Sequence, residues 1–267
     1  MSPVVFHARR LFRRYRNLLR CFGVRELFHD VRTRIARKLG LPALGTRYYN
    51  TIPGSDIPVC ARLGTSDAQV YNDIFVNRQY DDLVLSYEPR LIIDCGANVG
   101  YASASFLTRY PTAHVIAIEP EPGNFEICRR NLAPYEHRVS LFQCAVWSHD
   151  AGLKIDRGYR DGAEWSVQVR ECRPGEAPDI EARSIGDILH NAAVPEIDIL
   201  KMDIERSEAE VFARGYEPWL KSVKNIMIEL HDEECRKVFF AAMRDYNFES
   251  FESGETVICK SITPKTP

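Results

Sequence analysis

Glycine and asparagine alternate at the end of the apolar run Leu91–Gly100, and a carboxylate follows at a set distance. Gly96, Asn98 and Gly100 occupy every second position. Glycine tolerates positive φ and lets backbone approach a ligand closely, and asparagine is among the few other residues that tolerate this conformation. Glu119 ends a second apolar run, where its carboxylate can accept the hydrogen bonds of a ribose diol. The pattern predicts a crevice that binds a nucleoside.

The spacing of the small residues distinguishes two kinds of nucleoside ligand. Dinucleotide sites use G-x-G-x-x-G, whose last glycine lets a helix N-terminus face a pyrophosphate. Here the run reads D-x-G-x-N-x-G, and Glu119-Pro120 follows, a form that resembles the S-adenosylmethionine site of class I methyltransferases. A tight turn without a ligand accounts for the glycines alone, but not for Glu119. We expect S-adenosylmethionine to be bound by Asp94, Gly96, Asn98, Gly100, Glu119 and Pro120.

Four ionisable residues stand at the ends of two later apolar runs. Asp203 and Glu205 end one run, and Glu229 and His231 end the next. Ligands of parallel sheets gather at the carboxyl ends of the strands, so these side chains would converge near the same crevice. Alternatively, they mark the solvent face of ordinary strands. Because central parallel strands are covered on both faces, we favour the functional interpretation for Asp203 and Glu229, and leave that of His231 open.

The chemistry of methyl transfer gives these residues two alternative roles. Transfer from a sulfonium is an in-line displacement, so the protein must align acceptor oxygen, methyl carbon and sulfur and help to remove a proton. His231 can take a hydroxyl proton at neutral pH, with Glu229 or Asp203 orienting it. We expect these three residues to be catalytic without a metal ion. In the alternative, Asp203, Glu205, Glu229 and His231 bind Mg²⁺ or Mn²⁺, which lowers the pKa of the acceptor.

The elements that would position these residues alternate between strand and helix patterns, without internal repeats. We predict strands over 91–94, 115–119, 139–146, 198–204 and 225–231, helices over 101–110, 123–132, 184–192, 207–214 and 233–245, and a final hairpin of strands 248–252 and 256–260. The segment 153–181 is predicted to be irregular or a hairpin. Alternating strands and helices form parallel sheets through right-handed crossovers. The predicted fold is α/β, a doubly wound, mostly parallel seven-stranded sheet.

From about residue 71 to residue 260 the chain resembles the FkbM-type methyltransferases. The matching residues are Asp94-Cys-Gly-Ala-Asn-Val-Gly-Tyr101, Glu119-Pro120, Asn131, Ala145-Val146, Ser184-Ile-Gly-Asp187, Lys201-Met-Asp-Ile-Glu205, Glu208 and Glu229. The resemblance implies methyl transfer from S-adenosylmethionine to a hydroxyl of a sugar or glycan, a secondary metabolite or another small acceptor, and it adds Ala145 to the cofactor site. The family's usual D-x-E-G-x-E is altered here, because Arg206 replaces the glycine. This departure bears on acceptor size and on activity.

Two other classes of function stay open on the sequence. A noncatalytic binding or scaffold protein would keep the same fold, and Arg206 together with the basic N-terminal segment motivates this alternative, because a fold alone does not establish activity. An NAD-dependent oxidoreductase is less favoured, since the glycine spacing is not that of a dinucleotide site.

Charge is distributed unevenly along the chain. Residues 1–40 hold ten arginines and one lysine against two acidic residues, a net charge of +9 in a chain whose total is −2, so the remainder carries −11. Four arginines recur at helical spacing opposite an apolar face: Arg9, Arg13, Arg16 and Arg20. A second helical pattern covers residues 24–35 and is expected to pack against the rest of the chain. We expect a basic amphipathic helical extension over residues 1–45 and a methyltransferase domain over 46–267.

The basic helix has three interpretations: binding to an anionic membrane surface, contact with an acidic partner, or a solvated arm of the fold. The acidic remainder argues against nucleic acid, and the scarcity of serine argues against a mitochondrial presequence. No apolar stretch approaches the roughly 18–20 residues of a membrane-spanning helix, and the first 30 residues lack the apolar segment of a signal peptide. Eight scattered cysteines show neither zinc spacing nor a disulfide framework. We expect a cytoplasmic protein, with peripheral membrane attachment under the first interpretation.

Overall fold

The computed structural model describes residues 47–62, 65–156, 168–190 and 196–266, together with single residues between 15 and 35. The chain divides into two compact units, Met1–Arg78 and Gln79–Pro267. The single residues, among them Tyr15, Arg16 and Leu19, are helical. The rest of the predicted basic helix lies outside the described residues, and the packing of residues 24–35 stays a prediction. The boundary expected between residues 45 and 46 lies within the first unit and also stays a prediction.

The first unit contains a small antiparallel hairpin followed by a helix. β1 (Arg47–Thr51) pairs with β2 (Pro58–Arg62), and α3 (Asp67–Tyr71) continues into a π-helix at Asn72–Val76. The buried carboxylate of Asp67 accepts hydrogen bonds from the backbone N–H of Arg62 at 2.7 Å and from its Nη2 at 2.8 Å. This paired carboxylate joins β2 to the start of α3.

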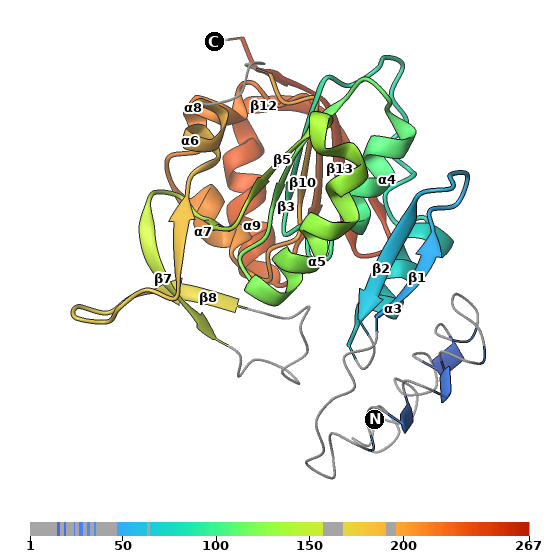
Figure 1. The fold of residues 1–267 in the computed structure, drawn as a ribbon. Helices are drawn as coiled ribbons and strands as arrows, with labels where there is room; N and C mark the ends of the chain where they lie inside the picture. Colours follow the sequence, from blue (N-terminus) through green and yellow to red (C-terminus); the bar gives the residue numbers. More distant parts are fainter. Residues whose placement is uncertain are drawn as a thin grey trace, which may run out of the picture. The chain divides into compact units, whose positions relative to one another are not determined.

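The second unit is built on a seven-stranded sheet with the strand order β12-β13-β11-β10-β3-β4-β5 (Figure 1). Its strands are β3 (Leu91–Cys95), β4 (His114–Ile118), β5 (Val139–Phe142), β10 (Ile199–Met202), β11 (Ile226–Glu229), β12 (Tyr246–Ser253) and β13 (Thr256–Pro264). The five strands from β11 to β5 are parallel, whereas β13 runs antiparallel to β11 and to β12. The predicted α/β fold with a mostly parallel sheet and a final hairpin is confirmed.

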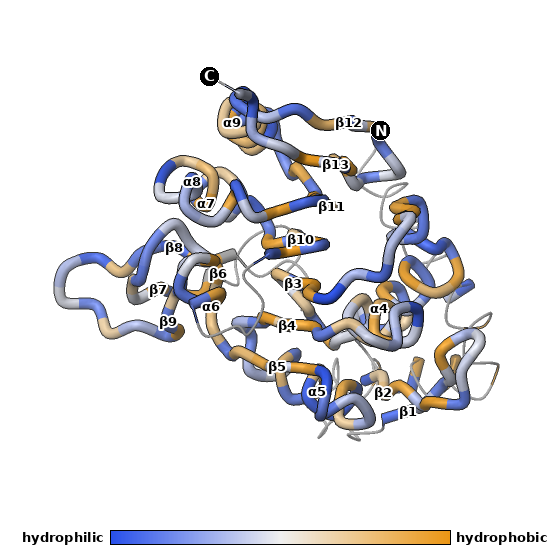
Figure 2. The backbone as a smooth tube through the Cα atoms, turned by 90° about the horizontal axis from the view of Figure 1, so that it is seen from above, coloured by the Kyte–Doolittle hydropathy of each residue, from blue (hydrophilic) through white to orange (hydrophobic). Residues whose placement is uncertain are grey.

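Helices cover both faces of this sheet. They are α4 (Tyr101–Arg109), α5 (Pro122–Leu132), α6 (Ile185–His190), α7 (Glu208–Ala213), α8 (Glu217–Leu220) and α9 (Glu233–Ala242). Figure 2 shows the strands in a row, with α4 on one side and α7 and α8 on the other. Every residue of β3 and β10 is buried, as expected for central parallel strands that helices cover on both faces. The carboxylates of Glu121 and Asp232 cap α5 and α9, because each accepts a hydrogen bond from a first-turn N–H.

The predicted single strand over 139–146 is wrong. The chain leaves the main sheet after β5, and β6 (Ala145–Val146) belongs to a second, four-stranded sheet with β7 (Ala151–Asp156), β8 (Gln168–Glu171) and β9 (Ile180–Arg183). A separate apolar cluster centred on Trp147 and Leu153 holds this sheet together. The hairpin alternative for 153–181 is confirmed by the antiparallel pairing of β7 with β8. Local hydrophobicity did not show where the chain passes from one sheet to the other.

The seven cysteines within the described ranges are all free, and six of them are buried. None of the described helices has the length and apolar character needed to cross a membrane.

Candidate active site

The carboxyl ends of four adjacent strands lie together in the second unit. Cys95 of β3 pairs in register with Ile118 of β4 and with Met202 of β10. Met202 in turn pairs with Ile228 of β11. Residues that directly follow these strands are therefore neighbours in space. This register brings the loop 96–100 close to the segments after β4, β10 and β11.

The loop after β3 adopts the left-handed backbone conformation at alternate residues. The φ angle is 77° at Gly96, 51° at Asn98 and 83° at Gly100. A Cβ atom at Gly96 would lie 1.9 Å from the carbonyl oxygen of Asp203, so only glycine fits there. The N–H of Gly96 donates to the carbonyl oxygen of Ile118 at 3.0 Å. The loop is thus held between the ends of β4 and β10.

The other end of this loop packs on α5. A Cβ atom at Gly100 would lie 3.1 Å from Sγ of Cys128 and 3.2 Å from Cγ of Leu132. Nδ2 of Asn131 donates to the carbonyl oxygen of Val99 at 2.8 Å. The buried amide of Asn131 therefore holds the loop against α5.

Glu119 directly follows β4, and its buried carboxylate is already hydrogen-bonded to the protein. Oε2 accepts from the N–H of Asn98 at 2.8 Å, while Oε1 accepts from the N–H of Glu121 at 2.9 Å and from Nδ2 of Asn124 at 3.4 Å. Burial raises the pKa of Glu119 to about 7, although these donors lower it. A carboxylate has about four acceptor positions, so the described contacts leave room for one further hydrogen bond. Whether Glu119 accepts one or both hydrogen bonds of a ribose diol stays a prediction.

Asp94, at the end of β3, makes its contacts inside the protein. Oδ2 accepts a hydrogen bond from the hydroxyl of Ser103 at 2.6 Å, and Oδ1 lies 3.0 Å from Nζ of Lys201. Lys201 was not among the predicted site residues, although a lysine inside an apolar strand is a signal that could have identified it. Burial lowers the pKa of Lys201, but Asp94, Tyr80 and Asp203 together raise it by more, so the net shift is upward. A direct contact of Asp94 with the cofactor stays a prediction.

The two remaining residues predicted for the cofactor site lie beyond the strand ends. Pro120 follows Glu119 and is half-buried. Ala145 is buried in β6, where it pairs with Ala182 of β9. Its place in the smaller sheet differs from the strand assumed for it, and its role at the cofactor stays a prediction.

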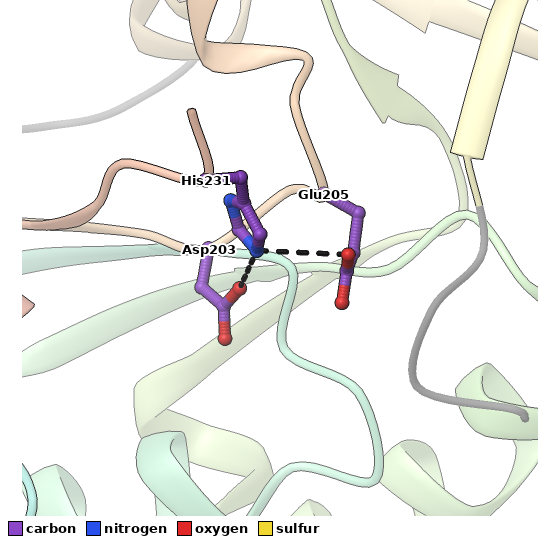
Figure 3. A group of neighbouring side chains, drawn as sticks. All are labelled: Asp203, Glu205 and His231. Carbon is purple, nitrogen blue, oxygen red and sulfur yellow. Dashed lines mark ion pairs between the residues drawn. The ribbon is translucent and has the colours of Figure 1, made fainter. Parts of the chain in front are cut away.

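His231 lies among four carboxylates, and Figure 3 shows it with two of them, Asp203 and Glu205. Its Nε2 is 3.6 Å from Oδ1 of Asp203, 3.6 Å from Oε2 of Glu205 and 3.5 Å from Oε1 of Glu229. On the opposite side of the ring, Nδ1 is 3.3 Å from Oε1 of Glu208. The structure thus brings together all four residues at the ends of β10 and β11. Glu208 was identified from the sequence only as part of the D-x-E-G-x-E pattern, in which its spacing from Asp203 was the available signal.

The negative charges in this cluster shift two pKa values. Burial lowers the pKa of His231, but Glu208, then Asp203 and Glu205, raise it, and the result is about 9. Burial and the neighbouring Asp203 raise the pKa of Glu229 to about 8, while His231 opposes the shift. The protonated imidazole is therefore favoured at neutral pH among these carboxylates.

The turn that carries Glu205 has an unusual backbone conformation. The φ angle is 52° at Glu205 and 79° at Arg206, a left-handed conformation that glycine adopts more readily than arginine. Nη2 of Arg206 pairs with Oδ2 of Asp232 at 2.5 Å. A cavity of about 430 Å³ lies beside this turn, and the residues lining it include Trp147, Glu171, Glu205, Arg206, Asp232 and Cys235.

The chain is similar to several known proteins. A model of the methyltransferase FkbM domain matches residues 94–250, which is more than half of the chain. The 2-O-methyltransferase NoeI of Sinorhizobium fredii is 30% identical over 175 residues, covering 60% of this chain and 70% of that protein. The methyltransferase sdnD of Sordaria araneosa is 26% identical over 211 residues, covering 67% of this chain and 81% of that protein. A solved methyltransferase FkbM from Methylobacillus flagellatus is 17% identical with a TM-score of 0.47, covering 67% of this chain and 45% of that one.

Proposed function

Because the chain belongs to the FkbM methyltransferase family, we propose that it transfers the methyl group of S-adenosylmethionine to a hydroxyl oxygen of a sugar or glycan, a secondary metabolite or another small acceptor. Family membership makes the chain an S-adenosylmethionine-dependent methyltransferase. The acceptor class and the oxygen as the methylated atom are our proposal. The 2-O-methyltransferase NoeI, which is 30% identical, supports an oxygen acceptor.

The residues at the ends of β3 and β4 fit the cofactor. S-adenosylmethionine supplies an activated methyl group when bound. Positive φ angles at Gly96, Asn98 and Gly100 make the loop turn tightly after β3. The loop lies beside the carboxylate of Glu119, where a ligand can approach its backbone. The remaining acceptor position of the Glu119 carboxylate suits one ribose hydroxyl. Asp94 and Lys201 contribute by holding the loop in place, because Nζ of Lys201 donates to the carbonyl oxygen of Gly96 at 2.8 Å.

One contact carries the proposal: the cofactor loop and the acidic cluster touch. The carbonyl of Asp203 fills the space where Gly96 lacks a Cβ atom. Asp203 therefore contacts the loop through its backbone and belongs to the acidic cluster through its side chain. Nε2 of His231 lies 3.6 Å from its carboxylate. A hydroxyl held by this cluster is placed next to the methyl donor, which is what in-line transfer requires.

We assign proton removal to the carboxylates at the rim of the cluster. The side chains of Asp203 and Glu229 are 32% and 20% exposed, whereas that of His231 is only 3% exposed. An arriving hydroxyl meets the carboxylates first, and a carboxylate at hydrogen-bond distance can accept its proton as the methyl bond forms. His231 acts as a positioning residue in this assignment. The catalytic set predicted from sequence is kept, with the roles of the imidazole and the carboxylates exchanged.

The acceptor would lie in the cavity beside Arg206. Its lining combines the indole of Trp147 with several charged groups, and such polar linings suit a hydroxylated compound better than a purely apolar one. Arg206 and its partner Asp232 narrow this cavity relative to a chain with glycine at position 206.

A methyl-transfer assay tests the proposal. The purified chain is incubated with S-adenosylmethionine and a panel of glycans, phenols and other hydroxylated compounds, and methylated product is identified by mass. We expect transfer to oxygen, and a roughly 10²- to 10⁴-fold lower kcat in Asp203→Asn or Glu229→Gln with little change in cofactor affinity. Glu249→Gln, on the edge strand β12 and outside the lining of this cavity, is the matched control. Transfer only to nitrogen or sulfur would overturn the oxygen assignment, and cofactor binding without any transfer would favour the noncatalytic alternative.

A further inference from the structure

Nε2 of His231 points into a group of carboxylate oxygens. The three nearest lie at 3.5–3.6 Å, which is long for hydrogen bonds. The side chain of His231 is only 3% exposed, so the imidazole and these oxygens face one another largely away from water. A ring nitrogen surrounded by three carboxylates in this way has the environment of a metal-ligand atom.

The spacing of these atoms fits a metal ion. One atom each from Asp203, Glu205 and His231 lie within 4.8 Å of one another. Bonds of about 2.1 Å to a common ion put neighbouring ligand atoms roughly 3.0 Å apart in octahedral geometry and about 3.4 Å apart in tetrahedral geometry. The 3.6 Å from Nε2 to each of the two carboxylates would have to shorten by roughly 0.2–0.6 Å. The two carboxylates, whose ligand atoms lie within 4.8 Å of each other, would have to approach further. An ion can reach the site from solvent, because the side chains of Asp203 and Glu229 are 32% and 20% exposed.

The other side of the imidazole is already arranged for this role. Oε1 of Glu208 faces Nδ1 of His231 at 3.3 Å. The same oxygen accepts a hydrogen bond from the N–H of Ile204 at 2.9 Å, which fixes the fully buried carboxylate. A carboxylate on Nδ1 keeps the proton on that nitrogen, so a metal ion would replace the proton that Nε2 carries in the free protein. This carboxylate–histidine arrangement is common behind metal-binding imidazoles.

We propose that Asp203, Glu205 and His231 form a binding site for a divalent metal ion. One imidazole and two carboxylates suit Mn²⁺ better than Mg²⁺, which prefers oxygen ligands alone. Glu229 is then the carboxylate left to accept the proton of the acceptor hydroxyl. The ion would hold that hydroxyl and lower its pKa; this role rests on the proposed function, whereas binding of the ion does not.

Manganese binding to the full chain tests the site directly. Protein treated with a chelator and then dialysed is titrated with Mn²⁺, and free Mn²⁺ is measured by electron paramagnetic resonance. We expect one saturable site per chain. Asp203→Asn and Glu205→Gln should each weaken Mn²⁺ binding at least tenfold, because each removes a charged ligand, whereas Glu234→Gln should change it less than twofold. Unaltered cofactor affinity in each variant shows that the chain is folded.

A spectroscopic signal identifies the imidazole. Nitrogen coupling to bound Mn²⁺ is expected in the wild-type chain and should be lost in His231→Gln. Absence of saturable binding, or equal binding by Asp203→Asn and the wild type, would overturn the metal site. Full methyl transfer in excess chelator would overturn the role of the ion while the proposed function stands. Saturable Mn²⁺ binding without methylation of any hydroxyl would overturn the proposed function while the metal site stands.

Discussion

Lys201 and Asp94 form a buried ion pair between two neighbouring central strands. Nζ lies 3.0 Å from Oδ1, and the two side chains are 3% and 0% exposed. The residues are paired in register across β10 and β3. Because Nζ also donates to the carbonyl oxygen of Gly96 at 2.8 Å, one ammonium group both neutralises the carboxylate and holds the cofactor loop.

Removing this ammonium should destabilise the fold strongly. In Lys201→Met the carboxylate of Asp94 stays buried without its partner, and breaking a buried pair in this way costs about 3–5 kcal/mol. Urea denaturation followed by circular dichroism measures the free energy of unfolding. The double variant Asp94→Asn with Lys201→Met should lose less than the two single losses combined. If the losses of unfolding free energy were additive, Asp94 and Lys201 would contribute to stability independently of each other.

The glycine at the start of the cofactor loop should tolerate no side chain. Gly96→Ala places Cβ 1.9 Å from a backbone oxygen, so β3 and β10 must separate and cofactor affinity should be lost. Gly175→Ala is the matched control, since its φ is also positive, at 84°, but its Cβ meets nothing within 4 Å. The control should cost only the roughly 1–2 kcal/mol of a left-handed alanine. Equal effects of the two substitutions on unfolding would contradict the steric explanation.

Cofactor affinity should depend on pH through Glu119. Its pKa is raised to about 7, and the ionised carboxylate is a stronger acceptor for a ribose hydroxyl than the protonated carboxyl. Affinity measured by calorimetry should therefore weaken as the pH falls below 7, by up to about tenfold per unit for one linked proton. Glu119→Gln should remove this component, and an identical slope in that variant would exclude Glu119.

The same shift has a consequence for the free protein. The folded state keeps a proton on Glu119 that the unfolded state releases near the ordinary value of 4.5. Stability contributed by the protonated form is therefore lost as the pH rises from about 4.5 to 7. Glu119→Gln should flatten this part of the stability profile.

Arg206 should carry backbone strain that glycine would relieve. Its φ of 79° costs a non-glycine residue roughly 1–2 kcal/mol. Arg206→Gly and Arg206→Ala both remove the half-exposed pair with Asp232, so their difference isolates the backbone effect. We expect the glycine variant to be more stable than the alanine variant by about 1 kcal/mol in urea denaturation. We also expect it to methylate larger acceptor molecules than the wild type. Equal stabilities would remove strain as the explanation.

The basic N-terminal segment should attach weakly to anionic membranes. Four arginines at helical spacing would face the lipid headgroups, and each is worth about 1 kcal/mol near such a surface. Co-sedimentation of the full chain with anionic vesicles should fall as salt rises. Replacing Arg9, Arg13, Arg16 and Arg20 with glutamine should abolish it. Sedimentation that is equal in the variant, or absent in the wild type, would leave the segment as a solvated arm.

Local sequence alone determined the cofactor loop and the order of elements around it. The alternation of small residues at 96, 98 and 100 predicts the left-handed conformations that the structure has, because few residue types tolerate positive φ. The strands and helices that bear the site were also predictable, since the periodicity of apolar residues reports burial within one element. The family pattern followed from the same short motifs.

Only the tertiary structure decided how the polar side chains share their partners. Glu119 was expected only to accept hydrogen bonds from a ribose diol, and the structure adds three donors from the protein itself to its carboxylate. Strand 139–146 was wrong because the choice between two sheets depends on packing partners such as Trp147 and Leu153. The inward-facing Nε2 of His231, with Glu208 behind it, depends on the register of β10 and β11 and on the turn between β10 and α7. Distances between residues far apart in the chain are set by packing, which no local pattern contains.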